Sequence, residues 1–69
     1  EKGEVVLKSY GFSTVRIRRH GEITRIEILP EDMGKLIERR QEITARLKEI
    51  GFTYLTLDLE GFRSGSMDI

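Results

Sequence analysis

The sequence predicts a small α+β domain: a two-layer sandwich in which a three-stranded mixed sheet carries one long helix on one face. Three observations predict it, namely a helical segment with a periodic apolar stripe, three short stretches of alternating apolar and polar residues, and a repeated pattern that ends a helix and begins a strand. The expected order is α-β-β-α-β. With 69 residues the chain suffices for one domain, residues 1–69, with a thin core.

The long helix is expected to begin at Pro30 and to end at Gly51. Proline suits the first helical position, and the two acidic residues that follow complement the positive end of the helix dipole. Arg40 interrupts the apolar stripe. A shorter helix is expected at residues 2–10. The stripe of the long helix consists of Met33, Leu36, Ile37, Ile43, Leu47 and Ile50.

One pattern occurs twice, at residues 7–12 and 47–52: Leu-Lys, two residues, then Gly-Phe. The glycine is expected to take the left-handed conformation that ends a helix, and the phenylalanine to pack back on the last turn. Each copy is followed by alternating apolar residues, so each predicts a strand directly after a helix.

Strands are expected at residues 13–19, 22–29 and 53–60, with a turn at His20 and Gly21 joining the first two. The third strand should run parallel to the second, since a helix connects them. We expect the first strand to lie between them, which gives the strand order 2-1-3. The apolar faces that would cover the helix are Val15 and Ile17, Ile26 and Ile28, and Leu55, Leu57 and Leu59.

Arg16 and Arg18 point away from this apolar face, toward an open and polar side of the sheet. Residues at i and i+2 of a strand stand about 6.5–7 Å apart, a spacing that suits two sides of one phosphate. In the expected strand order they would face Thr56 and Asp58 across the ladder. The alternative is a solvated, charged strand face that protects a sheet edge, and the pattern by itself fits both.

A glycine- and serine-rich segment follows the third strand and contains Arg63, Ser64 and Ser66. Such a segment can curl its backbone N–H groups around an anion, and it can equally be a flexible linker. It lacks the lysine and the spacing of a Walker phosphate loop. We therefore predict anion binding by Arg16, Arg18, Arg63, Ser64 and Ser66.

Composition excludes several other functions. The chain has no cysteine and one histidine, which rules out disulfides, thiolate metal sites and a cysteine nucleophile, and we assign no catalytic residue. Twelve basic and twelve acidic residues balance, so nucleic acid and membranes are not expected partners. The absence of cysteine fits a reducing compartment, so a cytoplasmic location is expected. Glu4 and Glu27 are a candidate carboxylate pair for a metal ion, with salt bridges to arginines as the alternative.

Three segments, residues 15–21, 24–28 and 51–67, together resemble one family. The most specific part is the run Leu-Asp-Leu-Glu-Gly, an aromatic residue, then Arg-Ser-Gly-Ser-Met, at residues 57–67. It resembles the C-terminal domain of the PP-loop ATP pyrophosphatase-type sulfur transferases, the LarE family, which insert sulfur during synthesis of the nickel-pincer cofactor. By this resemblance the chain is a piece from the C-terminus of a longer enzyme.

The resemblance implies that the parent uses ATP and Mg in an N-terminal PP-loop domain, and that this domain contributes to homo-oligomerisation. It implies that Arg16, Arg18 and Arg63 bind the phosphate of a pyridinium mononucleotide, and that Glu4 and Glu27 belong to a metal cluster. No cofactor is expected on this chain itself. The alternative is a non-catalytic binding module for single-stranded RNA or a protein partner, with Tyr54 as the aromatic candidate.

Overall fold

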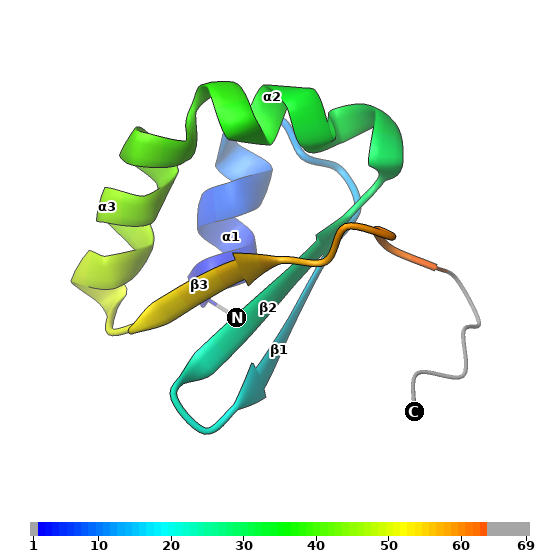
Figure 1. The fold of residues 1–69 in the computed structure, drawn as a ribbon. Coiled ribbons are helices and arrows are strands. Elements are labelled where there is room, and N and C mark those ends of the chain that lie inside the picture. Colours follow the sequence, from blue (N-terminus) through cyan, green and yellow to red (C-terminus); the bar gives the residue numbers. More distant parts are fainter. Residues whose placement is uncertain (1, 64–69) are drawn as a thin grey trace.

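The computed structural model describes residues 2–63. The order of elements confirms the predicted α-β-β-α-β order and the α+β class. Within the described residues, no helix has the length and apolar character needed to cross a membrane. The elements, shown in Figure 1, are α1 (Lys2–Ser9), β1 (Val15–His20), β2 (Ile23–Ile28), the 3-10 turn η1 (Pro30–Asp32), α2 (Met33–Glu38), α3 (Arg40–Ile50) and β3 (Tyr54–Leu57).

The sheet has the order β1-β2-β3, so the predicted order 2-1-3 is wrong. β1 pairs with β2 antiparallel, and β3 pairs with β2 parallel, which confirms the predicted direction of the third strand. Burial explains why β2 is central. Its residues Thr24, Ile26, Glu27 and Ile28 are all buried, on both faces of the sheet, whereas β1 is half-buried or exposed throughout. A strand rich in charged side chains is suited to an edge.

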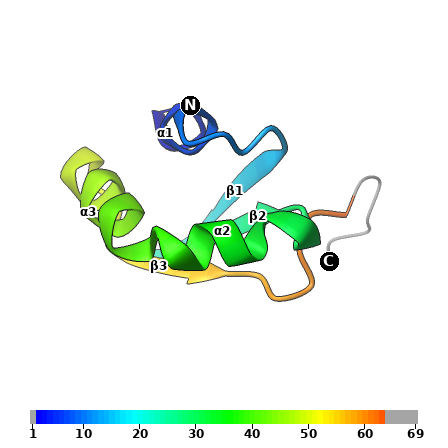
Figure 2. The same ribbon diagram turned by 90° about the horizontal axis from the view of Figure 1, so that it is seen from above.

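The helices form one layer on one face of the sheet. Viewed from above, α1 and α3 lie together on one side of the three strands (Figure 2). Gly3 allows this close approach, because a Cβ atom there would meet Ile17 Cδ1 at 2.7 Å and the ring of Phe52 at 2.9 Å. The buried apolar side chains between the layers are Val6, Leu7, Phe12, Ile26, Ile28, Leu36, Ile43 and Leu47.

The predicted long helix is broken at Arg39, so the single long helix is a second incorrect expectation. Arg39 has φ −105° and ψ 19°, which separates α2 from α3. Residues 38–42 contain no apolar side chain, so this stretch has nothing to hold it against the core. The break lets Leu36 of α2 and Ile43 of α3 both reach the core, while Ile37 of the predicted stripe is 47% exposed.

The repeated helix-to-strand pattern behaves as predicted in both copies. Gly11 has φ +99° and Gly51 has φ +120°, the left-handed region that a residue with a side chain rarely adopts. The N–H of Phe12 donates to the Leu7 carbonyl and that of Phe52 to the Leu47 carbonyl, the six-to-one bond of a Schellman cap. These caps end α1 and α3 and start the chain toward β1 and β3.

β3 is shorter than predicted and ends at Leu57. Leu59, expected on the apolar face, is 83% exposed, and that expectation is wrong. The chain turns instead: the Glu60 N–H donates to Asp58 Oδ1 at 2.9 Å, and the Gly61 N–H donates to the Asp58 carbonyl at 3.0 Å. An aspartate that binds the backbone two residues on is a strong turn former, and it takes Leu59 out of the sheet.

Candidate functional site

The strand register defines which side chains share the face of the sheet opposite the helices. Arg16 of β1 lies opposite Glu27 of β2, and Arg18 lies opposite Arg25. The predicted contact of Arg16 and Arg18 with Thr56 and Asp58 of β3 is therefore wrong, because β2 lies between the two strands. The prediction that Arg16 and Arg18 stand together on one face is confirmed by the same register.

Glu27 is the centre of this face. Its side chain is only 3% exposed, although it lies on the opposite face of β2 from the core residues Ile26 and Ile28. Arg25 is its closest ionic partner, with Nη2 at 3.0 Å from Oε2 and an Nε hydrogen bond of 3.1 Å to the same oxygen. Arg16 Nη1 lies 3.9 Å from Oε1 and Arg18 Nε lies 3.8 Å from Oε2. The carboxylate is thus enclosed by arginine side chains, and we call this group the arginine cluster.

Asp58 is a second carboxylate in contact with the cluster. Arg25 Nε lies 3.7 Å from Asp58 Oδ2, so Arg25 has two carboxylate neighbours, Glu27 and Asp58. The arginine side chains are 33–36% exposed, while Glu27 lies beneath them. The buried carboxylate is hydrogen-bonded to Arg25 and lies within ion-pair distance of Arg16 and Arg18, and all three guanidinium groups are partly exposed to solvent.

The segment after β3 returns to the same end of the sheet. The Phe62 N–H donates to the Ile28 carbonyl at 2.8 Å, and the Arg16 Cζ lies 5.4 Å from the centroid of the Phe62 ring. Gly61 permits this approach, since a Cβ there would meet the Ile28 carbonyl oxygen at 2.8 Å. Arg63 follows Phe62 and pairs with Glu60. Ser64 and Ser66, the other predicted anion ligands, lie outside the described residues.

The two predicted metal ligands are placed on opposite sides of the sheet. Glu27 lies on the open face, whereas Glu4 lies on α1, which packs on the face of Ile17. Residues 2–63 contain no group of three or more His, Cys, Asp or Glu side chains that could hold a metal ion. A carboxylate enclosed by three guanidinium groups suits an anion-binding surface better than a Mg²⁺ ligand set.

Arg25 is the site residue that the sequence analysis did not select. Its signal is present in the chain: Arg25 and Glu27 alternate on one strand with opposite charge, opposite a strand that carries Arg16 and Arg18. The register of the predicted hairpin, applied residue by residue, places Arg25 across from Arg18 and would have identified it. The salt-bridge alternative considered for Glu27 is confirmed.

The fold and the site define a small α+β domain with an arginine cluster on the open face of its sheet, and guanidinium groups are donors of the kind that anion-binding sites use. No protein-family model matches the chain. It is 45% identical over 65 residues, 94% of its length, to the pyridinium-3,5-bisthiocarboxylic acid mononucleotide synthase of Lactiplantibacillus plantarum, and covers 24% of that protein. The chain is thus similar to one part of a LarE-type synthase, which supports the resemblance to a LarE-related family.

Two further relatives are more distant. The chain is 33% identical over 69 residues, 97% of its length, to an uncharacterized protein of Synechocystis sp., of which it covers 26%. It is 33% identical over 64 residues, 93% of its length, to an uncharacterized protein of Methanocaldococcus jannaschii, of which it covers 25%. The chain spans about a quarter of the length of the curated relatives it matches.

Proposed function

We propose that this chain is the C-terminal, substrate-phosphate-binding domain of an ATP-dependent sulfur transferase of the PP-loop superfamily, which acts in nickel-pincer cofactor synthesis. The identity with a bisthiocarboxylic acid mononucleotide synthase supports the sulfur-transfer assignment. A mononucleotide carries a phosphate, and the observation that carries the proposal is the arginine cluster around buried Glu27.

In this proposal the phosphate binds on the open face, between Arg16 and Arg18 and the segment that contains Arg63. Arg16 contacts the ring of Phe62, the residue before Arg63, so the two parts of the predicted site lie at one end of the sheet. Guanidinium groups bind phosphate oxygens in a bidentate manner, and Glu27 holds two of them in place before the ligand arrives. Ser64 and Ser66 would add hydroxyl and backbone donors.

The chemistry itself belongs to the rest of the proposed parent enzyme. ATP and Mg would act in an N-terminal PP-loop domain, and this chain would contribute no catalytic residue. Binding energy at the phosphate would position a carboxylate of the substrate for activation, because energy gained at a remote group can be used to orient the reacting one. We also propose that the domain takes part in homo-oligomerisation of the parent.

The test replaces Arg16 or Arg18 by alanine in the full-length enzyme. Each loses a charge-assisted bond to phosphate, so we expect sulfur transfer (kcat/KM) to fall about 10- to 100-fold while ATP binding is retained. The matched control is Arg46→Ala, an exposed arginine of α3 that lies outside the cluster. Unchanged activity in both cluster variants would contradict the proposal.

A second substrate separates phosphate binding from a general loss of structure. With the corresponding nucleoside, which has no phosphate, the unaltered enzyme should be slow, and Arg16→Ala should cause little further loss. A variant that is equally impaired on nucleotide and nucleoside would show that Arg16 does not act through the phosphate.

The binding-module alternative predicts single-stranded RNA as the ligand. In its favour, Tyr54 is 59% exposed, and the register puts it on the same face as Arg25. Against it, the net charge is zero, where an RNA-binding surface should be basic. Titration of the chain with a mononucleotide and with an RNA oligomer, followed by NMR at the amides of Arg16 and Arg18, distinguishes the two ligands.

A further inference from the structure

The second edge of the sheet, formed by β3, has features of a docking site for a polypeptide. Within residues 2–63, β3 pairs only with β2, so its other edge is unpaired. The N–H groups of Tyr54 and Asp58 donate to carbonyls on the β2 side, at Glu22 and Ile26. Because successive residues of a strand direct their backbone groups to opposite edges, the N–H and C=O groups of Leu55 and Leu57 point away from the sheet.

This edge lacks the usual protection. Edge strands in natural proteins are shielded by charged side chains, proline, bulges or a covering element. The sequence of β3, Tyr-Leu-Thr-Leu, contains no charge and no proline. By contrast β1, the other edge strand, carries three arginines and a histidine in six residues. An edge strand without these protecting features can accept a further strand.

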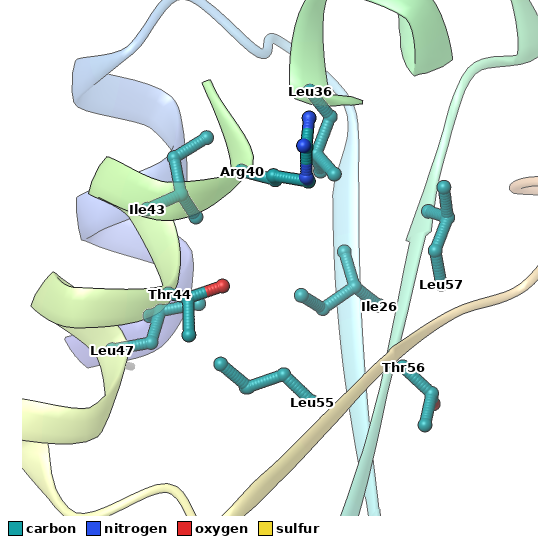
Figure 3. A pocket seen from close by; sticks show the side chains of 9 residues that line it. All are labelled: Ile26, Leu36, Arg40, Ile43, Thr44, Leu47, Leu55, Thr56 and Leu57. Carbon is teal, nitrogen blue, oxygen red and sulfur yellow. The ribbon is translucent and has the colours of Figure 1, made fainter. Parts of the chain in front are cut away.

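An apolar groove runs beside this edge. It lies between β3 and the helices α2 and α3, has a volume of about 220 Å³, and is shown in Figure 3. The volume exceeds the roughly 150 Å³ of an engineered cavity that takes up benzene, so it can receive an apolar side chain. Leu55 and Leu57 form one wall. The helices and β2 provide Leu36, Arg40, Ile43, Thr44, Leu47 and Ile26.

Arg40 gives the groove a charge preference. It lies on the first turn of α3, and its Nη1 donates a hydrogen bond to the Ile37 carbonyl at 3.0 Å. None of the ion pairs between described residues includes Arg40, whereas its neighbour Arg39 pairs with Glu42. The groove lining contains no carboxylate. A cationic group beside an apolar groove favours an occupant that carries a carboxylate next to its apolar side chains.

We propose that the β3 edge and this groove bind an extended segment of another polypeptide, which adds a fourth strand to the sheet. The segment would pair with the backbone of Leu55 and Leu57, place an apolar side chain in the groove, and direct an acidic side chain to Arg40. A second copy of this chain fits less well, since pairing β3 with β3 brings two Arg40 side chains to one edge with no carboxylate in either groove. The site is on the opposite face from the arginine cluster.

The test is an NMR titration of the 69-residue chain with a capped probe peptide, acetyl-Thr-Val-Thr-Glu-Thr-Val-amide. In an extended peptide the two valines and the glutamate lie on one face, as the groove requires. We expect amide shifts at Leu55, Leu57 and Arg40. The matched peptide with lysine in place of glutamate should bind about tenfold more weakly, the effect of one charge-assisted contact.

Two pairs of variants make the test specific. Leu57→Pro removes the outward N–H and should abolish binding, while Leu57→Val, of similar size, keeps the N–H and should retain it. Arg40→Glu should reverse the preference, so that the lysine peptide binds better than the glutamate peptide. Arg40 is exposed, so this variant should fold even if Leu57→Pro does not.

Three results would overturn the proposal. One is the absence of shifts at Leu55, Leu57 and Arg40 at millimolar peptide. Another is equal binding of the glutamate and lysine peptides, or no reversal in Arg40→Glu. The third is a dimer of the chain in solution that Leu57→Pro converts to a monomer, which would show that a second copy occupies the edge.

Discussion

The two edge strands of the sheet flank the same central strand but differ in what they offer a ligand. β1 carries Arg16, Arg18, Arg19 and His20, and Arg16 and Arg18 direct their charges to Glu27 on the open face. β3 carries no charged side chain, so the polar groups that it can offer to a ligand at its edge are backbone N–H and C=O groups. The comparison teaches that one small sheet can separate two kinds of surface. Charged side chains gather on one face beside β1, and the edge strand on the opposite side carries no charge.

The largest expected effect concerns Glu27, the buried carboxylate that pairs with the arginines of β1 and β2. Replacing Glu27 by glutamine leaves three arginines close together without their buried counter-charge, so we expect the free energy of unfolding to fall by about 3 kcal/mol. Urea denaturation measures it. The control is Glu42→Gln, whose pair with Arg39 is 53% and 59% exposed, and which should change stability by less than about 0.5 kcal/mol. Equal effects in the two variants would show that burial of Glu27 does not organise the cluster.

The next effect tests how the segment after β3 reaches the β1 side. Gly61→Ala combines a φ of +83° with a Cβ contact of 2.8 Å to the Ile28 carbonyl oxygen, and we expect a loss of about 2 kcal/mol. The control is Gly21→Ala, with φ +62° and open space around the new Cβ, which should cost about 1 kcal/mol. Thermal unfolding compares them. If Gly21→Ala is the more damaging variant, the close approach at Gly61 is not a significant constraint.

The smallest effect concerns β3. The Thr56 hydroxyl donates to the Thr24 carbonyl at 2.9 Å, a side-chain bond that adds to the pairing of β3 with β2. Thr56→Val keeps the shape and the strand preference but removes the bond, so we expect a loss of about 0.5–1 kcal/mol. Thr53→Val, at an exposed position before β3, should be neutral in the same denaturation experiment. Hydrogen exchange at the Thr56 amide should rise in the first variant and not in the second.

The local features were predictable because they depend on a few neighbouring residues. The caps at Gly11 and Gly51 follow from a glycine and a phenylalanine at fixed spacing, and both were found as expected. The shared face of Arg16 and Arg18 follows from the two-residue period of a strand. The break at Arg39 is also indicated by the sequence, because residues 38–42 contain no apolar side chain. The prediction of one long helix gave more weight to Pro30 and to the apolar stripe.

The strand order was not predictable in the same way. Both orders satisfy the apolar alternation of the three strands, and they differ in which strand is buried on both faces. That difference decides the partners of Arg16 and Arg18. The observed order removes Thr56 and Asp58 as neighbours of Arg16 and Arg18, leaves Glu27 and Arg25 opposite them, and puts β3 at an edge with a groove beside it.

By itself the sequence determined the element types, the helix-ending glycines, the face on which the arginines stand and the relation to the LarE-type family, because each depends on residue identity and spacing. Only the tertiary structure decided that β2 is central, that Glu27 is buried under three arginines, and that β3 is an edge strand of the sheet formed by residues 2–63. These features depend on which segments are buried in the small interior of the domain. The free energy of the whole chain decides this, so it cannot be read from any single segment.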